Sequence, residues 1–380
     1  MRTASSQSLT NMNQDLATQM KYTIGVTHPS IRDGEFNFPR GLAFDRRRGQ
    51  LYVVDNWNHD IQVFLSEDGS FMSKFGYGLV DGPWGVAIDD DHDRMLVADS
   101  TANRIQVWSL NDRSFVTSIV EGSRDLAFNC PRGIAIDEYH QRIIIADTNN
   151  DRLVFLSSID LSFLFELGKQ GSQPGEFHYP SGVAIDHDRH RIIVSDTFNH
   201  RVQVLSLIDG SFLFQFGSPG NRPGQFYRPQ GVCVDNQGRI IVVDTFNCRL
   251  QAFTHEGHPI TSLKCTEGLP SEVAFDSHRG LIAFSAGNRV HVIGANQWLP
   301  DTWFMWRVER HCDTPPSMKR VIETVTMIRS LHHESTLSLL PNELLFEIFA
   351  MLNPSTWKPT PRCTSPSRQS QPDERTCTLL

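Results

Sequence analysis

Short apolar runs separated by polar turns extend along most of the chain, and they return in a fixed order. In the clearest copy, residues 183–185 and 192–194 are rich in β-branched side chains, 202–204 alternates apolar and polar positions, and 212–216 ends before a glycine. Apolar runs of this length, bounded by polar turns, are typical of β-strands. We therefore expect four strands in each copy and name them a to d in chain order.

Three markers hold the copies in register. A glycine opens strand a, an aspartate ends strand b, and an arginine follows five residues later. The glycines are Gly41, Gly85, Gly133, Gly182 and Gly231, with Glu272 in a sixth copy. The aspartates are Asp55, Asp99, Asp147, Asp196 and Asp244, with Ser285 in the sixth copy. The arginines are Arg104, Arg152, Arg201 and Arg249, with Asp60 in the first copy and Arg289 one residue early in the last. Six four-stranded copies predict an all-β fold, a six-bladed β-propeller.

The first strand of the chain is expected to close the ring. The sixth copy has three strands and no strand d, because Gly294 leads into a Trp-containing segment. Residues 22–25, before the first copy, have the sequence of a strand d with its final glycine. We predict that this segment completes blade six, which would cover an otherwise open sheet edge.

The motif Pro-x-Gly-[Ile/Val]-Ala-[Ile/Val]-Asp, followed by Val-x-Asp-x-x-Asn-x-Arg-[Ile/Val]-Gln-Val, resembles the NHL repeat, as found in the NHL domain of TRIM-NHL-type proteins. The resemblance implies six blades and a binding face built from the b–c turns and the d–a loops. The repeated Asp and Arg have two readings. They pair within the hairpin or with the next blade, or the arginines form a ring that binds phosphate or acidic peptide.

Aromatic residues and one arginine are the candidate contacts on that face. The predicted protein-binding residues are Trp57, Trp84, Phe198, Tyr227, Arg228 and Phe246. These residue types are common in protein-interface hot spots, and packing between blades is the alternative for each. Phe36, Phe177 and Phe226 recur at one position, so we expect them to wedge between blades.

Composition changes on both sides of the repeats. We expect a disordered leader over 1–20, the propeller over 21–295, a Trp-rich linker and amphipathic helix over 296–336, a helix over 337–352 and a disordered tail over 353–380. Residues 337–352 resemble the opening of an F-box, which implies docking on a Skp1-like adaptor; packing on the preceding helix is the alternative. The docking residues would be Leu340, Pro341, Leu344, Leu345, Ile348, Phe349 and Leu352.

The net charge and the cysteine pattern limit the classes of partner and the cellular location that we expect. The formal net charge is −8, which gives no general attraction to nucleic acid or anionic membrane. No signal peptide or transmembrane run is evident, and the seven cysteines include no Cys-x-x-Cys, so we expect a cytoplasmic protein with reduced thiols. Cys377 is the fourth residue from the end, but without a polybasic run a lipid anchor there is not expected.

Three functions follow from these observations. The first is a non-catalytic protein-interaction propeller, a substrate-recognition or scaffold component linked to ubiquitin ligation, whose ligase activity would come from a partner because no RING-type Cys/His array is present. The second is an RNA-binding NHL propeller. The third is a metal-dependent propeller enzyme. Since strand a has no histidine aligned toward a channel and no catalytic constellation stands out, we expect no enzyme activity, no metal site and no cofactor.

Overall fold

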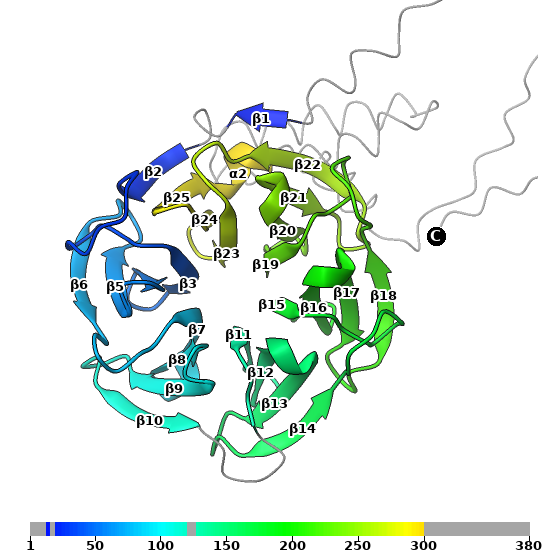
Figure 1. The fold of residues 1–380 in the computed structure, drawn as a ribbon, viewed down its shortest axis with the longest axis horizontal. Coiled ribbons are helices and arrows are strands. Elements are labelled where there is room, and N and C mark those ends of the chain that lie inside the picture. Colours follow the sequence, from blue (N-terminus) through cyan, green and yellow to red (C-terminus); the bar gives the residue numbers. More distant parts are fainter. Residues whose placement is uncertain (1–12, 16–19, 120–126, 300–380) are drawn as a thin grey trace, which may run out of the picture. The chain divides into compact units, whose positions relative to one another are not determined.

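Six radial sheets surround a central axis in the computed structural model, which describes residues 13–15, 20–119 and 127–299 (Figure 1). Blade one comprises β3 (Pro39–Asp45), β4 (Gln50–Asp55), β5 (Asp60–Leu65) and β6 (Phe71–Phe75). Blade two comprises β7 (Pro83–Asp89), β8 (Arg94–Asp99), β9 (Arg104–Ser109) and β10 (Phe115–Ile119). Blade three comprises β11 (Pro131–Asp137), β12 (Arg142–Asp147), β13 (Arg152–Ser157) and β14 (Phe163–Leu167). The predicted four-stranded copies are confirmed.

The second half repeats the same antiparallel order. Blade four comprises β15 (Pro180–Asp186), β16 (Arg191–Asp196), β17 (Arg201–Ser206) and β18 (Phe212–Phe216). Blade five comprises β19 (Pro229–Val234), β20 (Ile240–Asp244), β21 (Arg249–Phe253) and β22 (Pro259–Lys264). Blade six comprises β23 (Pro270–Asp276), β24 (Leu281–Ala286), β25 (Arg289–Gly294) and, from the start of the chain, β2 (Met20–Gly25). The predicted six-bladed propeller is therefore confirmed.

The ring closes through the N-terminal strand, as predicted. β2 runs antiparallel to β25, with Thr23 opposite His291 and Ile24 opposite Val290. A further strand, β1 (Asn13–Asp15), pairs in parallel with β22 of blade five. These three residues differ from the disordered leader expected over 1–20. The free edge of β22 offers backbone groups with which they pair.

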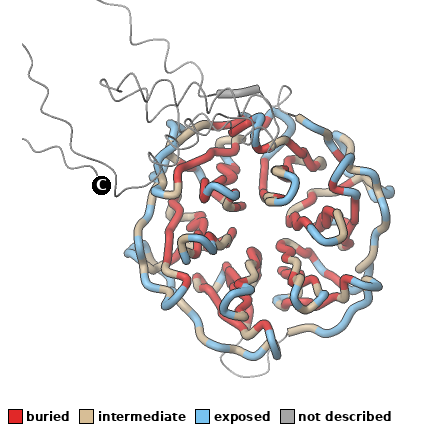
Figure 2. Tube along the Cα trace, turned by 180° about the vertical axis from the view of Figure 1, so that it is seen from behind, coloured by how far each residue is buried: buried red, intermediate tan, exposed pale blue. Residues whose placement is uncertain are grey.

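The core lies between neighbouring blades. Strands b are buried along their length, as in β4, β12 and β24, whereas strands d alternate between half-buried and exposed positions, as in β18. Buried positions consequently lie in the inner strands, and exposed ones lie along the outermost strands and in the turns (Figure 2). Phe36, Phe177 and Phe226 are completely buried, which confirms their prediction as wedges.

The repeated Asp and Arg pair within the b–c hairpin, which confirms their structural reading. Arg201 Nε lies 2.8 Å from the buried Asp196 carboxylate, and its other nitrogens donate to the carbonyls of Ser172 and Glu176 in the preceding d–a loop. The equivalent pairs Arg104–Asp99, Arg152–Asp147 and Arg249–Asp244 have separations of 2.7, 2.8 and 2.8 Å. Each arginine therefore fixes a loop to its own blade.

The marker assigned to Ser285 in the sixth copy is wrong by one residue. Pro270 pairs with Ala286, as Pro180 pairs with Asp196, so Ala286 holds the aspartate position. Ser285 instead matches Ser195, since the hydroxyl of each accepts a backbone N–H from strand a. The cause is a shorter turn, because Ala286 pairs directly with Arg289 across two intervening residues.

The described part of the chain continues slightly beyond the predicted end of the propeller at residue 295. The short helix α2 (Ala295–Trp298) follows β25, and Trp298 is fully buried in the apolar cluster of blades five and six. The predicted adaptor-docking helix over 337–352 and Cys377 lie outside the described residues. Within the described ranges, no helix has the length and apolar character needed to span a membrane.

Candidate functional site: the upper face and the channel mouth

The d–a loops and b–c turns form one face, which we call the upper face. Backbone hydrogen bonds join them: Phe198 donates to the His178 carbonyl at 3.0 Å, and Phe246 donates to the Tyr227 carbonyl at 3.2 Å. The same bond joins Asn149 to Asn129 at 3.0 Å. The a–b and c–d turns lie on the opposite side, the lower face. The predicted contact residues consequently share one face.

Three of those residues are exposed aromatics. Trp57 is 58% exposed, and its ring packs against Phe38 with centroids 4.5 Å apart. Tyr227 and Phe246 are 45% and 42% exposed and meet edge to face at 5.8 Å. Each ring has one side supported by the protein and the other open to solvent, so the binding of a partner would not require these side chains to become ordered.

Phe198 and Arg228 are half-buried and belong to a stack. The Phe198 ring lies parallel to Tyr179, with centroids 4.6 Å apart. The Arg228 guanidinium lies 4.9 Å from the Phe198 ring centroid and 5.1 Å from that of Phe246. Cation–π contacts of this kind hold an arginine in place without neutralising it. Phe198 therefore supplies a packed ring, and Arg228 supplies a positive charge that is held against it.

Trp84 lies nearer the axis, between two arginines. The guanidinium carbons of Arg40 and Arg132 lie 4.2 and 3.9 Å from the Trp84 ring centroid. Arg132 also lies over Tyr179 at 4.6 Å and donates to its hydroxyl at 2.9 Å. Arg40, Trp84 and Arg132 are the variable residue of the Pro-x-Gly motif in blades one to three. We call the six residues at that position the channel-mouth ring: Arg40, Trp84, Arg132, Ser181, Gln230 and Ser271.

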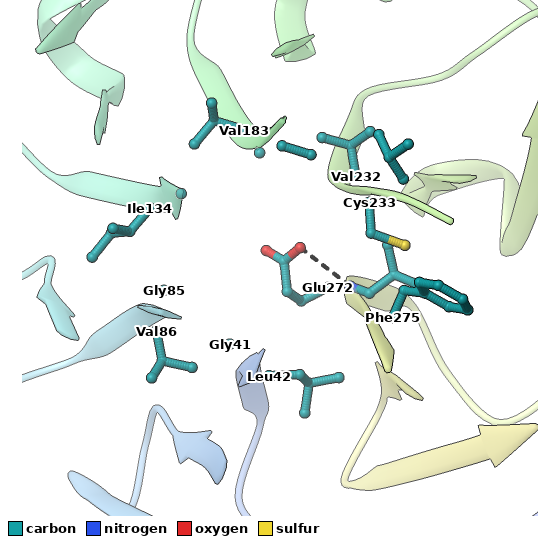
Figure 3. A pocket seen from close by; sticks show the side chains of 15 residues that line it. Gly41, Leu42, Gly85, Val86, Ile134, Val183, Val232, Cys233, Glu272 and Phe275 are labelled. Atoms are coloured by element: carbon teal, nitrogen blue, oxygen red, sulfur yellow. Dashed lines mark hydrogen bonds between the residues drawn. The ribbon is translucent and has the colours of Figure 1, made fainter. Parts of the chain in front are cut away.

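Directly below the channel-mouth ring, the strands a surround a channel of about 180 Å³. In blade two this position requires glycine because the blades touch: a Cβ at Gly85 would collide with the carbonyl oxygen of Arg132 in the next blade. In blade six, Glu272 replaces the glycine. Its carboxylate projects into the channel and accepts a hydrogen bond from the Val273 backbone at 3.2 Å (Figure 3). Apolar side chains such as Leu42 and Ile134 line the channel together with the backbone of the glycines.

Burial changes the proton affinity of the charged groups around the channel. It raises the pKa of Glu272 to about 7, and the positive charge of Arg40 acts in the opposite direction. Burial lowers the pKa of Arg40 to about 10; repulsion by Arg132 adds to this decrease, and Glu272 opposes it. Although the Glu272 side chain is only half-buried, protein surrounds its carboxylate, and a narrow channel stabilises a charge less than bulk water does.

The arginines of this face differ from those of the hairpins. Within the described ranges, Arg40, Arg132 and Arg228 have no carboxylate within 4 Å. The Nε atoms of Arg40 and Arg132 are buried and have no hydrogen-bond partner among those residues. Gln230, also in the channel-mouth ring, has a buried Oε1 in the same condition. The mouth therefore holds two cations, Arg132 buried and Arg40 half-buried, whose Nε atoms have no partner among the described residues.

Arg40, Arg132, Tyr179 and Glu272 were not among the predicted contact residues. The available signal was the variable position of Pro-x-Gly, where Arg40, Trp84 and Arg132 interrupt an otherwise regular motif. In the part of the chain that the structure describes, no three His, Cys, Asp or Glu side chains are grouped to hold a metal ion. Cys233 lines the channel, and burial raises the pKa of its thiol.

The comparison with family models agrees with the motif and the geometry. The NHL repeat model matches residues 36–64, 177–205 and 226–253, which lie in blades one, four and five. The propeller contains NHL repeats. The matched model describes the repeat itself, so it does not single out TRIM-NHL-type proteins among NHL propellers. No curated protein matches the chain.

Solved structures share the fold of this NHL propeller at low identity. A gluconolactonase from Xanthomonas campestris is 17% identical with a TM-score of 0.56, over 73% of this chain and 91% of that one. A streptogramin B lyase is 14% identical with a TM-score of 0.51, over 71% and 96%. A chain of the nidogen/laminin complex is 17% identical with a TM-score of 0.50, over 62% and 83%.

These likenesses correct the expectation that the chain is not an enzyme. Two of the similar propellers are enzymes by name, so the absence of activity does not follow from this fold. At 14% and 17% identity the likeness shows the fold alone and assigns no reaction to the channel.

Proposed function

We propose that the upper face of this NHL propeller binds a protein ligand. The observation that carries the proposal is the set of exposed aromatic rings next to arginines without carboxylate partners. Trp57, Tyr227 and Phe246 offer supported rings, and Arg228 lies over Phe246. Trp, Tyr and Arg are the residues most enriched in interface hot spots, since each combines apolar area with a polar or charged group.

The lower face supports the choice by contrast. Several of its arginines have carboxylate partners: Arg48 lies 3.1 Å from Asp45 and 2.9 Å from Asp93, and Arg142 lies 2.7 Å from Asp137. A ligand binding there would have to compete with these internal pairs. On the upper face, a ligand would meet cations that still lack a counter-charge.

The test is affinity purification of the full chain followed by mass spectrometry. The variant Trp57→Ala/Phe246→Ala removes two exposed rings of the upper face, and Tyr139→Ala is the matched control because Tyr139 is 80% exposed in an a–b turn of the lower face. We expect at least tenfold lower recovery of specific partners with the double variant and unchanged recovery with the control. Equal recovery from all three proteins would contradict the proposal.

RNA is the other class of ligand that stacked aromatics and arginines accept. A ribonuclease-treated sample separates the two cases. A protein ligand stays bound after treatment, whereas partners that disappear only after treatment indicate that the face binds RNA. The overall charge of −8 favours the protein ligand.

A link to ubiquitin ligation would depend on residues 337–352, and its support is the sequence resemblance alone. If that segment docks a Skp1-like adaptor, deletion of 337–352 should remove the adaptor from the purified complex and leave the ligand of the upper face. Recovery of no adaptor with the full chain would reject the link without affecting the ligand.

A further inference from the structure

Arg228 places a charge at a loop position that is uncharged in the other blades. It directly precedes the proline that opens strand a, and the φ angle there is 54°, close to the 56° of Phe38 and the 64° of Tyr179. The residues at this position in the other blades are Phe38, Gly82, Cys130, Tyr179 and Leu269. Because the loop adopts this conformation with uncharged residues, the fold does not require an arginine here.

The Arg228 guanidinium is held in place but has no hydrogen-bond acceptor. Its carbon lies 4.9 Å from the Phe198 ring centroid and 5.1 Å from that of Phe246. Within the described ranges, only the backbone N–H of Arg228 donates a hydrogen bond, to His200 Nδ1 at 3.0 Å. Its side-chain nitrogens are not among the buried polar atoms that lack a partner, so solvent reaches them. The N–H donors of this guanidinium are therefore available to a ligand.

Nearby charges leave Arg228 without compensation. Asp244, the hairpin acid of blade five, is fully buried and already pairs with Arg249 at 2.8 Å. Through Tyr179, the same stack continues to Arg132, which also has no carboxylate within 4 Å among the described residues. In a chain with a net charge of −8, this part of the upper face is therefore suited to a negatively charged group.

We propose that Arg228 binds the carboxylate of an Asp or Glu side chain in the ligand, an inference that rests on the protein ligand proposed above. A planar carboxylate matches the guanidinium fork and can accept two parallel hydrogen bonds. The exposed rings of Tyr227 and Phe246 lie beside this charge and would contact an apolar residue next to the acid. One carboxylate neutralises one guanidinium, whereas a phosphate dianion would leave an unpaired charge against apolar rings.

Selection from a displayed library of short random peptides tests this assignment, with the full chain and its Arg228→Gln variant as baits. We expect peptides selected by the wild type to carry Asp or Glu next to an aromatic or aliphatic residue, and peptides selected by the variant to lack this acid. A selected acidic peptide, measured by isothermal titration, should bind Arg228→Gln at least tenfold more weakly, because a charge-assisted bidentate contact is lost.

Arg222→Gln is the matched control. Arg222 is an exposed arginine of the same d–a loop, so its substitution removes the same charge without removing the cation held between the rings. It should change the affinity less than twofold. Since the Arg228 side chain has no hydrogen bond to the described residues, Arg228→Gln should unfold at the wild-type temperature. If it unfolds lower, Arg228→Lys provides the test: it keeps the charge, loses the fork geometry, and should bind the acidic peptide several-fold more weakly.

Different failures have different meanings. Selected peptides without an acid, or equal affinity for the wild type and a folded Arg228 variant, would overturn the role of Arg228 and leave the protein ligand intact. Failure to select any peptide whose binding requires Trp57 and Phe246 would contradict the protein ligand itself, and this inference with it. Tighter binding after replacement of the acid by phosphoserine would overturn the choice of carboxylate. Arg228-dependent binding of oligouridylate, without any acidic peptide, would overturn it in favour of RNA.

Discussion

Blade four and the sector formed by blades six and one have the same topology but differ in their buried charges. Blade four pairs its buried aspartate with an arginine, whereas the other sector holds acidic groups without such a partner. In blade four, Asp196 is fully buried and faces Arg201 across the hairpin. In blade one, the equivalent Asp55 faces Asp60. In blade six, Glu272 occupies a position that is glycine in the other five blades. The comparison shows that the ring tolerates the loss of its ion pairs and its glycine where the chain closes on itself.

Hydrogen bonds to the first aspartate explain this tolerance. Asp55 accepts from the Asn37 backbone at 2.9 Å, from Asn58 at 2.7 Å and from Gln62 at 3.2 Å. Asp196 accepts the equivalent bonds from His178, Asn199 and Gln203. The aspartate therefore organises the hairpin in both blades, whereas the arginine is an addition that blade one lacks.

The largest decrease in the free energy of unfolding is expected from breaking the Arg201–Asp196 ion pair of blade four. Arg201→Gln leaves the buried Asp196 without its counter-charge and removes the bonds to Ser172 and Glu176. Loss of one partner of a buried ion pair typically costs about 3–5 kcal/mol. Urea denaturation should show a decrease of that size in the free energy of unfolding.

Arg189→Gln in the same blade is the control. Arg189 pairs with Asp186 at 3.4 Å near the lower face and is more exposed, so its loss should cost less than about 1 kcal/mol. Similar losses in the two variants would mean that burial of the pair does not explain the stability of blade four.

In blade one, substitution of the equivalent hairpin residue, Asp60, is expected to increase the free energy of unfolding. Burial raises the pKa of Asp55 to about 8, and the negative charge of Asp60 adds to this increase. Burial raises the pKa of Asp60 to about 6; Lys74 opposes the increase and Asp33 adds to it. Asp60→Asn removes one of the two charges. At pH 8 we expect an increase of about 1–2 kcal/mol in the free energy of unfolding. A decrease would show that Asp60 has a stabilising role that these contacts do not include.

The stability gain from Asp60→Asn should also depend on pH. Both pKa values lie above the ordinary value of 3.8, so the native state binds more protons than the unfolded state between about pH 4 and pH 8. The contribution of the pair to stability is therefore greatest at low pH and falls as pH rises through this window. The gain from Asp60→Asn should be near zero at pH 4 and largest at pH 8, measured by denaturation at each pH; a constant gain would contradict the titration of the pair.

The sequence predicted the regular part of this comparison and missed the irregular part. Blade four could be predicted because its strand lengths, glycine and Asp–Arg pair recur with a fixed spacing. Arg40, Trp84 and Arg132 belong to copies more than 40 residues apart, and their contact depends on the ring geometry rather than on any local pattern. The position of Ser285 was misassigned because the last b–c turn is shorter than the others.

The smallest change in the free energy of unfolding is expected from a substitution at Glu272, because its side chain is only half-buried. Its pKa of about 7 lies above the ordinary 4.5, so the cost of its charge is present above pH 7 and disappears as the pH falls toward 4.5. Glu272→Gln should raise the free energy of unfolding by about 1 kcal/mol or less at pH 8 and leave it unchanged at pH 4.5. An equal gain at pH 4.5 and at pH 8 would mean that the buried charge of Glu272 does not destabilise blade six.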